Sequence, residues 1–218
     1  MNYRASAGIL LTILGTSCFT VGAEGQIWPP FEITAFGGYR GSGSLALDDP
    51  SYSRLDFADG AVYGIAVGMS VEPADSPGNG AIEFMWTHQD STLKALPNPG
   101  AADISMNMNV DQFHFNGLYL PPRFERVLPY VIAGLGATRY APEGDTSSLT
   151  LFSWALGAGA KVPLTKHLGL RLEAKWDPAL ANASGGVFCN SATGQCFAAA
   201  SGKTINQFDF TAGLSLRI

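Results

Sequence analysis

Apolar and polar side chains alternate along eight segments of the chain, which is the pattern of β-strands with one apolar face. The most regular segment is the last, whose apolar face carries Phe208, Phe210, Ala212, Leu214, Leu216 and Ile218. The eight segments are residues 31–40, 59–71, 81–89, 104–120, 129–140, 152–162, 168–177 and 207–218. The alternation therefore predicts eight strands.

Two of these segments do not keep a simple period of two. In residues 104–120 the apolar positions change from even-numbered to odd-numbered residues. A β-bulge near Asp111 and Gln112 would reverse the faces, because one extra residue turns every later side chain to the other side. In residues 129–140, two glycines fall on the same face as Tyr130, so the pattern leaves the outward face of this strand undecided.

The connections between the segments are alternately long and short. The short ones, within residues 73–80, 121–126 and 163–167, are rich in proline, glycine and charge, as turns require. Tight turns at one end and long loops at the other are the construction of outer-membrane barrels. The sequence thus predicts an all-β fold, an eight-stranded antiparallel up-and-down transmembrane β-barrel with both termini on the periplasmic side.

Composition favours a membrane barrel over its alternative, a soluble β-domain. Charged residues make up only 14% of the chain, and its mean hydropathy of +0.12 is too low for a helical membrane protein. In a barrel only alternate residues face lipid, which reconciles the two values. The net charge of −5 argues against nucleic acid as a partner, because no basic stripe is available.

Aromatic residues near the strand ends fit the same interpretation. Membrane barrels place aromatic side chains in girdles at the two bilayer interfaces. The residues expected in such girdles are Tyr39, Trp86, Tyr130, Tyr140, Trp154, Trp176 and Phe208.

Residues 1–23 have the layout of a signal peptide. A positively charged start precedes a short apolar run, and small residues precede a cleavage site between Ala23 and Glu24. The run is shorter than the roughly 20 apolar residues that span a bilayer. We therefore expect a mature barrel of residues 24–218. A lipoprotein signal is the alternative, with lipid on Cys18, although Gly15 stands where such signals usually carry leucine.

The polar faces of the strands carry charges that would point into the barrel. They are Glu83, Lys161, Arg171, Glu173, Lys175, Asp209 and Arg217. The interior of an eight-stranded barrel is only wide enough for its own side chains, and a buried charge without a partner is costly. We expect these side chains to form an ion-paired plug, and a narrow diffusion pore is the alternative.

The remaining candidate chemistry is sparse. Cys189 and Cys196 lie in the longest loop, and export to an oxidising compartment favours a disulfide between them, with a metal pair as the alternative. His88 lies near Asp90 and Ser91, but successive residues of a strand point to opposite faces, so His88 and Ser91 do not pair simply. We expect no catalytic residue, no metal and no cofactor.

Four pieces of the chain resemble the OmpA/OmpX-like family of small outer-membrane β-barrels, often described as porin-like. They are residues 31–40, 128–138, 168–174 and 207–218. The resemblance implies residence in the bacterial outer membrane, contact with its lipid, and recognition of the C-terminal strand by the barrel-assembly machinery. Such barrels usually end in an aromatic residue, whereas this chain ends in Ile218.

Together these features predict a non-enzymatic barrel with a structural or surface-interaction role. Its long extracellular loops would meet an extracellular ligand that the sequence does not identify. A barrel enzyme that modifies lipid A is the alternative from a different functional class, and the cluster around His88 is the only feature that favours it.

Overall fold

A computed structural model describes residues 31–47, 51–71, 79–121, 127–143, 148–181, 187–190, 195–198 and 204–218. The predicted signal peptide and its cleavage site lie outside these residues. Within them, no helix is long and apolar enough to cross a bilayer.

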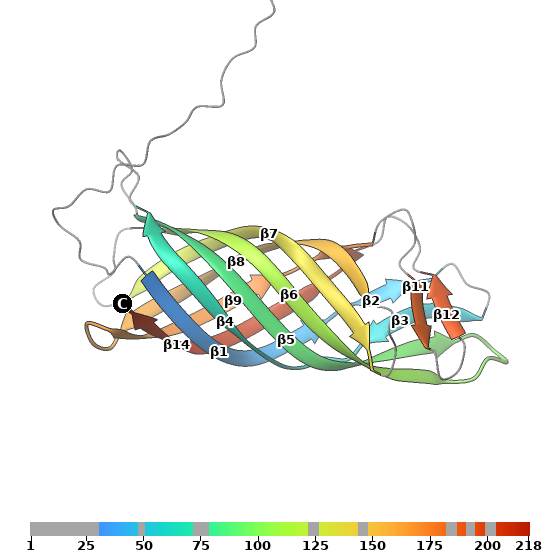
Figure 1. Cartoon of the computed structure of the whole chain (residues 1–218). Helices are drawn as coiled ribbons and strands as arrows, with labels where there is room; N and C mark the ends of the chain where they lie inside the picture. The colour runs from blue at the N-terminus through green and yellow to red at the C-terminus, as the bar shows by residue number, and fades with distance from the viewer. Residues whose placement is uncertain are drawn as a thin grey trace, which may run out of the picture.

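Eight long strands form a closed antiparallel barrel (Figure 1). They are β1 (Phe31–Ser42), β4 (Gly60–Val71), β5 (Asn79–Pro97), β6 (Ile104–Leu120), β7 (Leu128–Pro142), β8 (Leu149–Pro163), β9 (Leu168–Trp176) and β14 (Gln207–Arg217). Each strand pairs with the next, and β14 closes onto β1 in a continuous register from Glu32↔Arg217 to Ser42↔Gln207. The predicted fold class is confirmed. Closure leaves no unpaired sheet edge around the barrel wall.

The end of the barrel opposite the C-terminus carries six shorter strands. They are β2 (Ser44–Ala46), β3 (Tyr52–Phe57), β10 (Ala179–Leu180), β11 (Val187–Asn190), β12 (Gln195–Ala198) and β13 (Thr204–Ile205). β3 pairs with the far half of β5, and β2 pairs with β3, so the sheet continues beyond the barrel (Figure 1). The regions expected to be long loops therefore contain additional strands.

Two zones follow one another along the barrel. In the first, which we call the belt, large apolar side chains point outward and polar ones inward; on β9, Leu172 is 46% exposed while Arg171 is buried. In the second, the cap, the arrangement is reversed. The buried core of the cap is Leu45, Leu47, Tyr52, Leu55, Phe57, Leu93, Ala95, Met106, Met108, Val110, Tyr140, Leu151, Ala179, Ala181 and Ile205.

The prediction of a β-bulge near Asp111 and Gln112 was wrong. The pairing of β6 with β5 and with β7 runs through both residues without a shift in register. Even-numbered side chains of β6 point inward along almost its whole length. The apolar face changes because the surroundings change: outward side chains of the belt meet lipid, while inward side chains of the cap build a core.

The placement of Tyr130 and Tyr140 in an aromatic girdle was also wrong. Both rings lie inside the barrel, with Tyr130 2% and Tyr140 0% exposed. Two glycines of β7 create the space that the interior needs. A Cβ atom at Gly134 would collide with the side chain of Asn116, and one at Gly136 with His114. Backbone oxygens of Phe113 and Phe115 would also collide with these Cβ atoms, so the two positions accept only glycine because β6 as a whole approaches them.

Candidate functional site

The polar interior of the belt begins near the termini with a three-residue ion cluster. Glu32 accepts hydrogen bonds from Nζ of Lys161 at 2.5 Å and from Nε of Arg217 at 3.1 Å. The three residues come from β1, β8 and β14, so the cluster ties the closing strands of the barrel together. Above it, the hydroxyls of Thr34 and Ser215 lie 2.8 Å apart.

Arg171 of β9 is the centre of the next cluster. Its guanidinium contacts both carboxylate oxygens of Glu83 on β5 and lies 2.5 Å from Glu173. Its Nε donates to the hydroxyl of Tyr130 at 2.8 Å, and that hydroxyl donates to Glu173 at 2.7 Å. Two carboxylates and one guanidinium are thus held across the barrel by forked, charge-assisted hydrogen bonds.

A third cluster lies below the cap, around Arg40 of β1. Nε and Nη2 of Arg40 donate to the two carboxylate oxygens of Asp209 at 2.6 and 2.7 Å. Nη2 also donates to Gln112 at 2.7 Å and to Thr87 at 2.9 Å. Gln112 then donates to Gln207 at 2.6 Å. Arg40 is 0% exposed, and these partners replace the water around Nε and Nη2, while Nη1 has no hydrogen-bond partner among the described residues.

Lys175 and His114 are also buried in the interior of the barrel. Nζ of Lys175 lies 3.3 Å from a carboxylate oxygen of Asp177. Nε2 of His114 lies 3.0 Å from the hydroxyl of Ser153, and both residues are fully buried. The pair lies inside the barrel.

All seven charges predicted for the lumen lie inside the barrel, each no more than 7% exposed. The structure distributes them over several ion-paired groups: Glu83 with Arg171 and Glu173, Lys161 with Arg217 on Glu32, Asp209 with Arg40, and Lys175 with Asp177. The last two groups adjoin, since Asp177 interacts with Asp209 and Arg40. Among the described residues of these clusters, five cations face five carboxylates, so the charges balance.

Several residues of these clusters were missed by sequence reasoning. Arg40 and Asp177 fall on the polar faces of their strands, so the alternation that found the other charges also signals these two. Gln112 and Tyr130 carried no such signal, because the inward faces of residues 104–120 and 129–140 were not correctly predicted. Their roles depend on which strands face one another across the lumen, and alternation contains no information on that.

The cap closes the lumen at the end opposite the C-terminus (Figure 1). Its core draws side chains from β2, β3, β5, β6, β7, β8, β10 and β13, and Leu55 and Ile205 are 0% exposed. Arg40 and its partners lie next below this core, since the ring of Tyr140 belongs to the core and also lies close to Arg40. The apolar core of the cap is thus in direct contact with the polar interior of the belt.

The structure separates His88 from Ser91. The ring nitrogens of His88 lie 2.7 Å from Asp111 and 3.1 Å from Asp90 on the outward side of the wall. Ser91 points inward and donates to the carbonyl of Ala58 at 2.9 Å. In the part of the chain that the structure describes, no group of three or more His, Cys, Asp or Glu side chains could hold a metal ion.

Strands β11 and β12 form a hairpin in which Cys189 and Cys196 are register partners. Directly opposed residues of an antiparallel pair have Cα atoms about 4.5–5.5 Å apart, which lies within the range that a disulfide bridges. The backbone register is therefore compatible with the expected bond.

Four features recur around the wall of the belt: closed strand register, outward apolar side chains, inward ion pairs and aromatic residues near the strand ends. They define a transmembrane β-barrel, the form in which strands cross a bilayer without an unsatisfied edge. The chain belongs to the outer membrane protein beta-barrel domain family, whose sequence profile matches residues 15–217. Its location is the bacterial outer membrane.

Solved structures of small outer-membrane barrels are similar to this fold. The chain is similar to Neisserial surface protein A (NspA) with a TM-score of 0.52 and 14% identity, over 86% of this chain and 97% of that one. It is similar to OprG from Pseudomonas aeruginosa with a TM-score of 0.49 and 11% identity, over 88% and 97% of the two chains. At this identity the similarity to NspA supports the fold alone. A search of curated proteins by sequence finds no match.

Proposed function

We propose that the protein is a closed, non-enzymatic barrel that anchors an interaction surface, built by the cap, on the outside of the cell. The observation that carries this proposal is the double closure of the lumen. Ion pairs fill the belt interior, and the apolar core of the cap covers the end of the barrel. An open channel needs a continuous column of water through the barrel. The ion-paired interior of the belt and the apolar core of the cap both oppose such a column.

Planar-bilayer recording on the purified barrel tests the closure. We expect no steady conductance from the wild-type protein. A steady, large, ion-selective current would show an open lumen and would defeat the proposal in favour of a diffusion pore.

The surface role requires the cap to lie outside the cell and the short turns in the periplasm. Lys94 is exposed on the cap, and Lys166 is exposed in the turn between β8 and β9. A membrane-impermeant amine reagent applied to intact cells should label Lys94 but leave Lys166 unmodified until the cells are lysed. Labelling of Lys166 alone would reverse the orientation.

Lipid A modification is the enzymatic alternative, and the cluster of His88, Asp90 and Asp111 is the observation that favours it. Mass spectrometry of lipid A from cells with and without the protein distinguishes the two functions. We expect identical spectra. A mass change that disappears with His88→Ala would establish the enzyme.

Two further proposals concern maturation. Cleavage between Ala23 and Glu24 should give a mature N-terminus at Glu24, which N-terminal sequencing of the outer-membrane fraction tests. A lipid-modified start at Cys18 would contradict this cleavage site.

Cys189 and Cys196 should be joined by a disulfide in the exported protein, so an unreduced digest should contain the linked peptide. Two free thiols would contradict the bond.

A further inference from the structure

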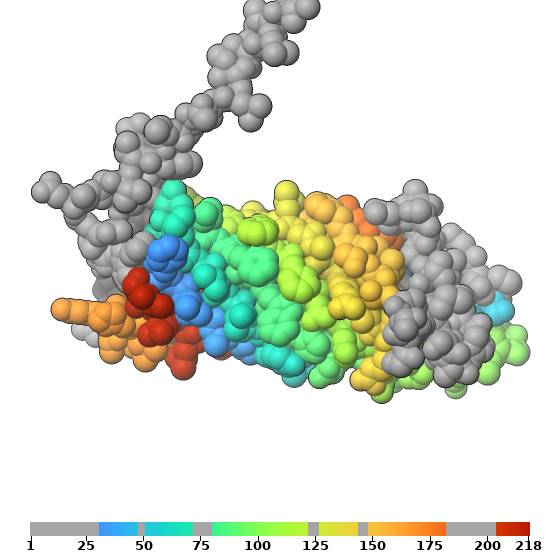
Figure 2. Space-filling view, viewed as in Figure 1, coloured from blue at the N-terminus to red at the C-terminus, as the bar shows by residue number. Residues whose placement is uncertain are grey.

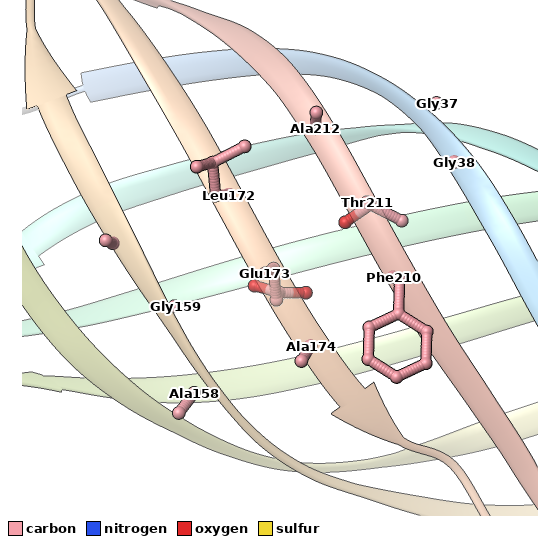
Figure 3. A pocket seen from close by; sticks show the side chains of 11 residues that line it. Gly37, Gly38, Ala158, Gly159, Leu172, Glu173, Ala174, Phe210, Thr211 and Ala212 are labelled. Carbon is pink, nitrogen blue, oxygen red and sulfur yellow. The ribbon is translucent and has the colours of Figure 1, made fainter.

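The outward surface of the belt is hollowed over β8, β9, β14 and β1 (Figure 3). An open groove of about 640 Å³ lies between the larger side chains of Leu172 and Phe210. Its floor is made of small residues, among them Gly37, Ala158, Ala174 and Ala212. The carboxylate of Glu173, which also borders it, is bonded to Arg171 and Tyr130 in the lumen, so the groove is apolar.

The surface over β4–β7 has larger side chains than the floor of the groove. On β4–β7 many of the outward positions carry large side chains, among them Ile65, Phe84, Phe115 and Leu135, which are 40–72% exposed. In Figure 2 this side of the molecule is a continuous surface of packed side chains. The groove therefore lies on the side of the wall formed by β8, β9, β14 and β1.

An aromatic cluster borders the groove at the end nearer the cap. The rings of Trp154 and Trp176 are 4.6 Å apart, and Phe208 stacks on Trp176 at 6.3 Å. Trp176 follows Ala174 by two residues, a rise of about 7 Å along a strand. Tryptophan settles at the boundary between hydrocarbon and headgroups, and the indole nitrogen of Trp176 donates to Asn206 at 3.2 Å. The groove thus begins just inside one bilayer interface.

We propose that this groove binds one acyl chain of an outer-leaflet lipid, whose headgroup lies beside the cluster of Trp154, Trp176 and Phe208. The choice of leaflet rests on the orientation proposed above. The groove is continuous with the lipid-facing surface of the belt, and an unfilled hollow would forfeit the dispersion contacts of its lining. A flexible hydrocarbon chain is the occupant that this surface always meets.

A second copy of the chain fits less well. Two hollow surfaces that meet across a two-fold axis leave a gap, so the groove is not self-complementary. The bulky surface of β4–β7 could enter it only through a head-to-tail contact, which repeats without closing in a dimer.

Native mass spectrometry of the mature protein in detergent with added lipid A tests the proposal. We expect one lipid A molecule to remain bound at collision energies that remove all others. Filling the groove with Ala158→Phe and Ala212→Phe should lower the abundance of the protein with one bound lipid by about tenfold, which corresponds to a tenfold weaker affinity. The matched control is Ala133→Phe, an outward alanine of β7 outside the groove, which should retain the lipid.

The outcomes are separable from those of the closure and labelling experiments, because lipid retention depends on neither conductance nor orientation. Ala174→Leu, a smaller filling change, serves if the double variant does not fold, and it should lower retention in the same direction. Equal retention by filled and control proteins would overturn the proposal. A wild-type dimer that the filled variant loses would assign the groove to a second copy instead.

Discussion

Strand β6 passes through both zones of the barrel. Its outward face is apolar in the belt and polar in the cap, and its inward face changes the other way. In the belt, Phe115 points outward and is 72% exposed, while His114 points inward and is 0% exposed. In the cap, Met108 points inward and is 1% exposed, while Ser105 faces outward. The backbone phase is the same throughout. The comparison shows that the medium outside the wall, lipid or water, decides which face of a strand is apolar.

The two zones also differ in what holds their interiors together. The belt interior depends on directional partners, since Arg40 and Asp209 are 0% and 1% exposed and bonded through two nitrogens. The cap keeps its charges on the surface, where Arg54 and Asp56 are 51% and 37% exposed. Its interior is held by apolar contacts, which are not directional as hydrogen bonds are. An ion pair should therefore contribute much more to the free energy of unfolding in the belt than in the cap.

The largest effect is expected for Asp209→Ala in the belt. The change leaves the Arg40 guanidinium buried with only neutral partners, which should lower the free energy of unfolding by about 3–5 kcal/mol. Denaturant titration of the barrel in lipid vesicles measures this value. The double variant Arg40→Met, Asp209→Leu should recover most of the loss, because apolar replacement of both partners removes the unpaired charge. A double variant less stable than Asp209→Ala would contradict the explanation.

Leu55→Ala should be the next most damaging change. Leu55 is 0% exposed in the core of the cap, so its truncation leaves a cavity and should cost about 2–5 kcal/mol. The matched change Leu214→Ala faces lipid, where mobile hydrocarbon fills the vacated space, and should cost less. The same vesicle titration compares them, and equal losses would show that the core of the cap adds little to stability.

A charge placed on the outward face of β6 should locate the boundary between the zones. Phe115 lies midway between Asp111 and Tyr119 on this face, so Phe115→Arg should cost about 2–4 kcal/mol, as a cation does near the bilayer midplane. Ser105→Arg, ten residues earlier on the same face, should leave the unfolding free energy almost unchanged because it meets water. Similar costs at both positions would place the cap inside the bilayer.

The smallest effect is expected for Arg54→Ala. This side chain pairs with Asp56 at 3.0 Å on the surface of the cap, and exposed pairs contribute about 0–1 kcal/mol. The unfolding free energy in vesicles should change within that range. A loss as large as that of Asp209→Ala would remove the energetic distinction between the zones.

Alternation and the turn residues together were sufficient to predict the number of strands in the barrel wall, the closed antiparallel fold and the inward direction of the charges. These properties follow from the period of two and from turn residues, both of which are local in the sequence. Alternation was not sufficient for β6 and β7. A change of apolar face has two causes, an inserted residue or a change of medium, and the side chains of residues 104–120 alone do not distinguish them.

The sequence did not predict which charged side chains pair inside the lumen, and the reason is geometric. Arg171 meets Glu83 across the barrel, with 88 positions between them in the chain. The tilt and stagger of the strands bring the two side chains to the same height. The inward direction of Tyr130 likewise depends on the close approach of β6 to Gly134 and Gly136, where only glycine fits.

The reversed polarity of the cap also separates what evolution must keep from what it is free to change. Inward positions such as Leu55 and Met108 interlock with several strands, so few replacements preserve the core. Outward positions such as Lys94 and Ser105 contact mainly water, and substitutions there carry little energetic penalty. In the proposed orientation these outward positions form the exposed end of the molecule, which can change in sequence while the barrel beneath it stays the same.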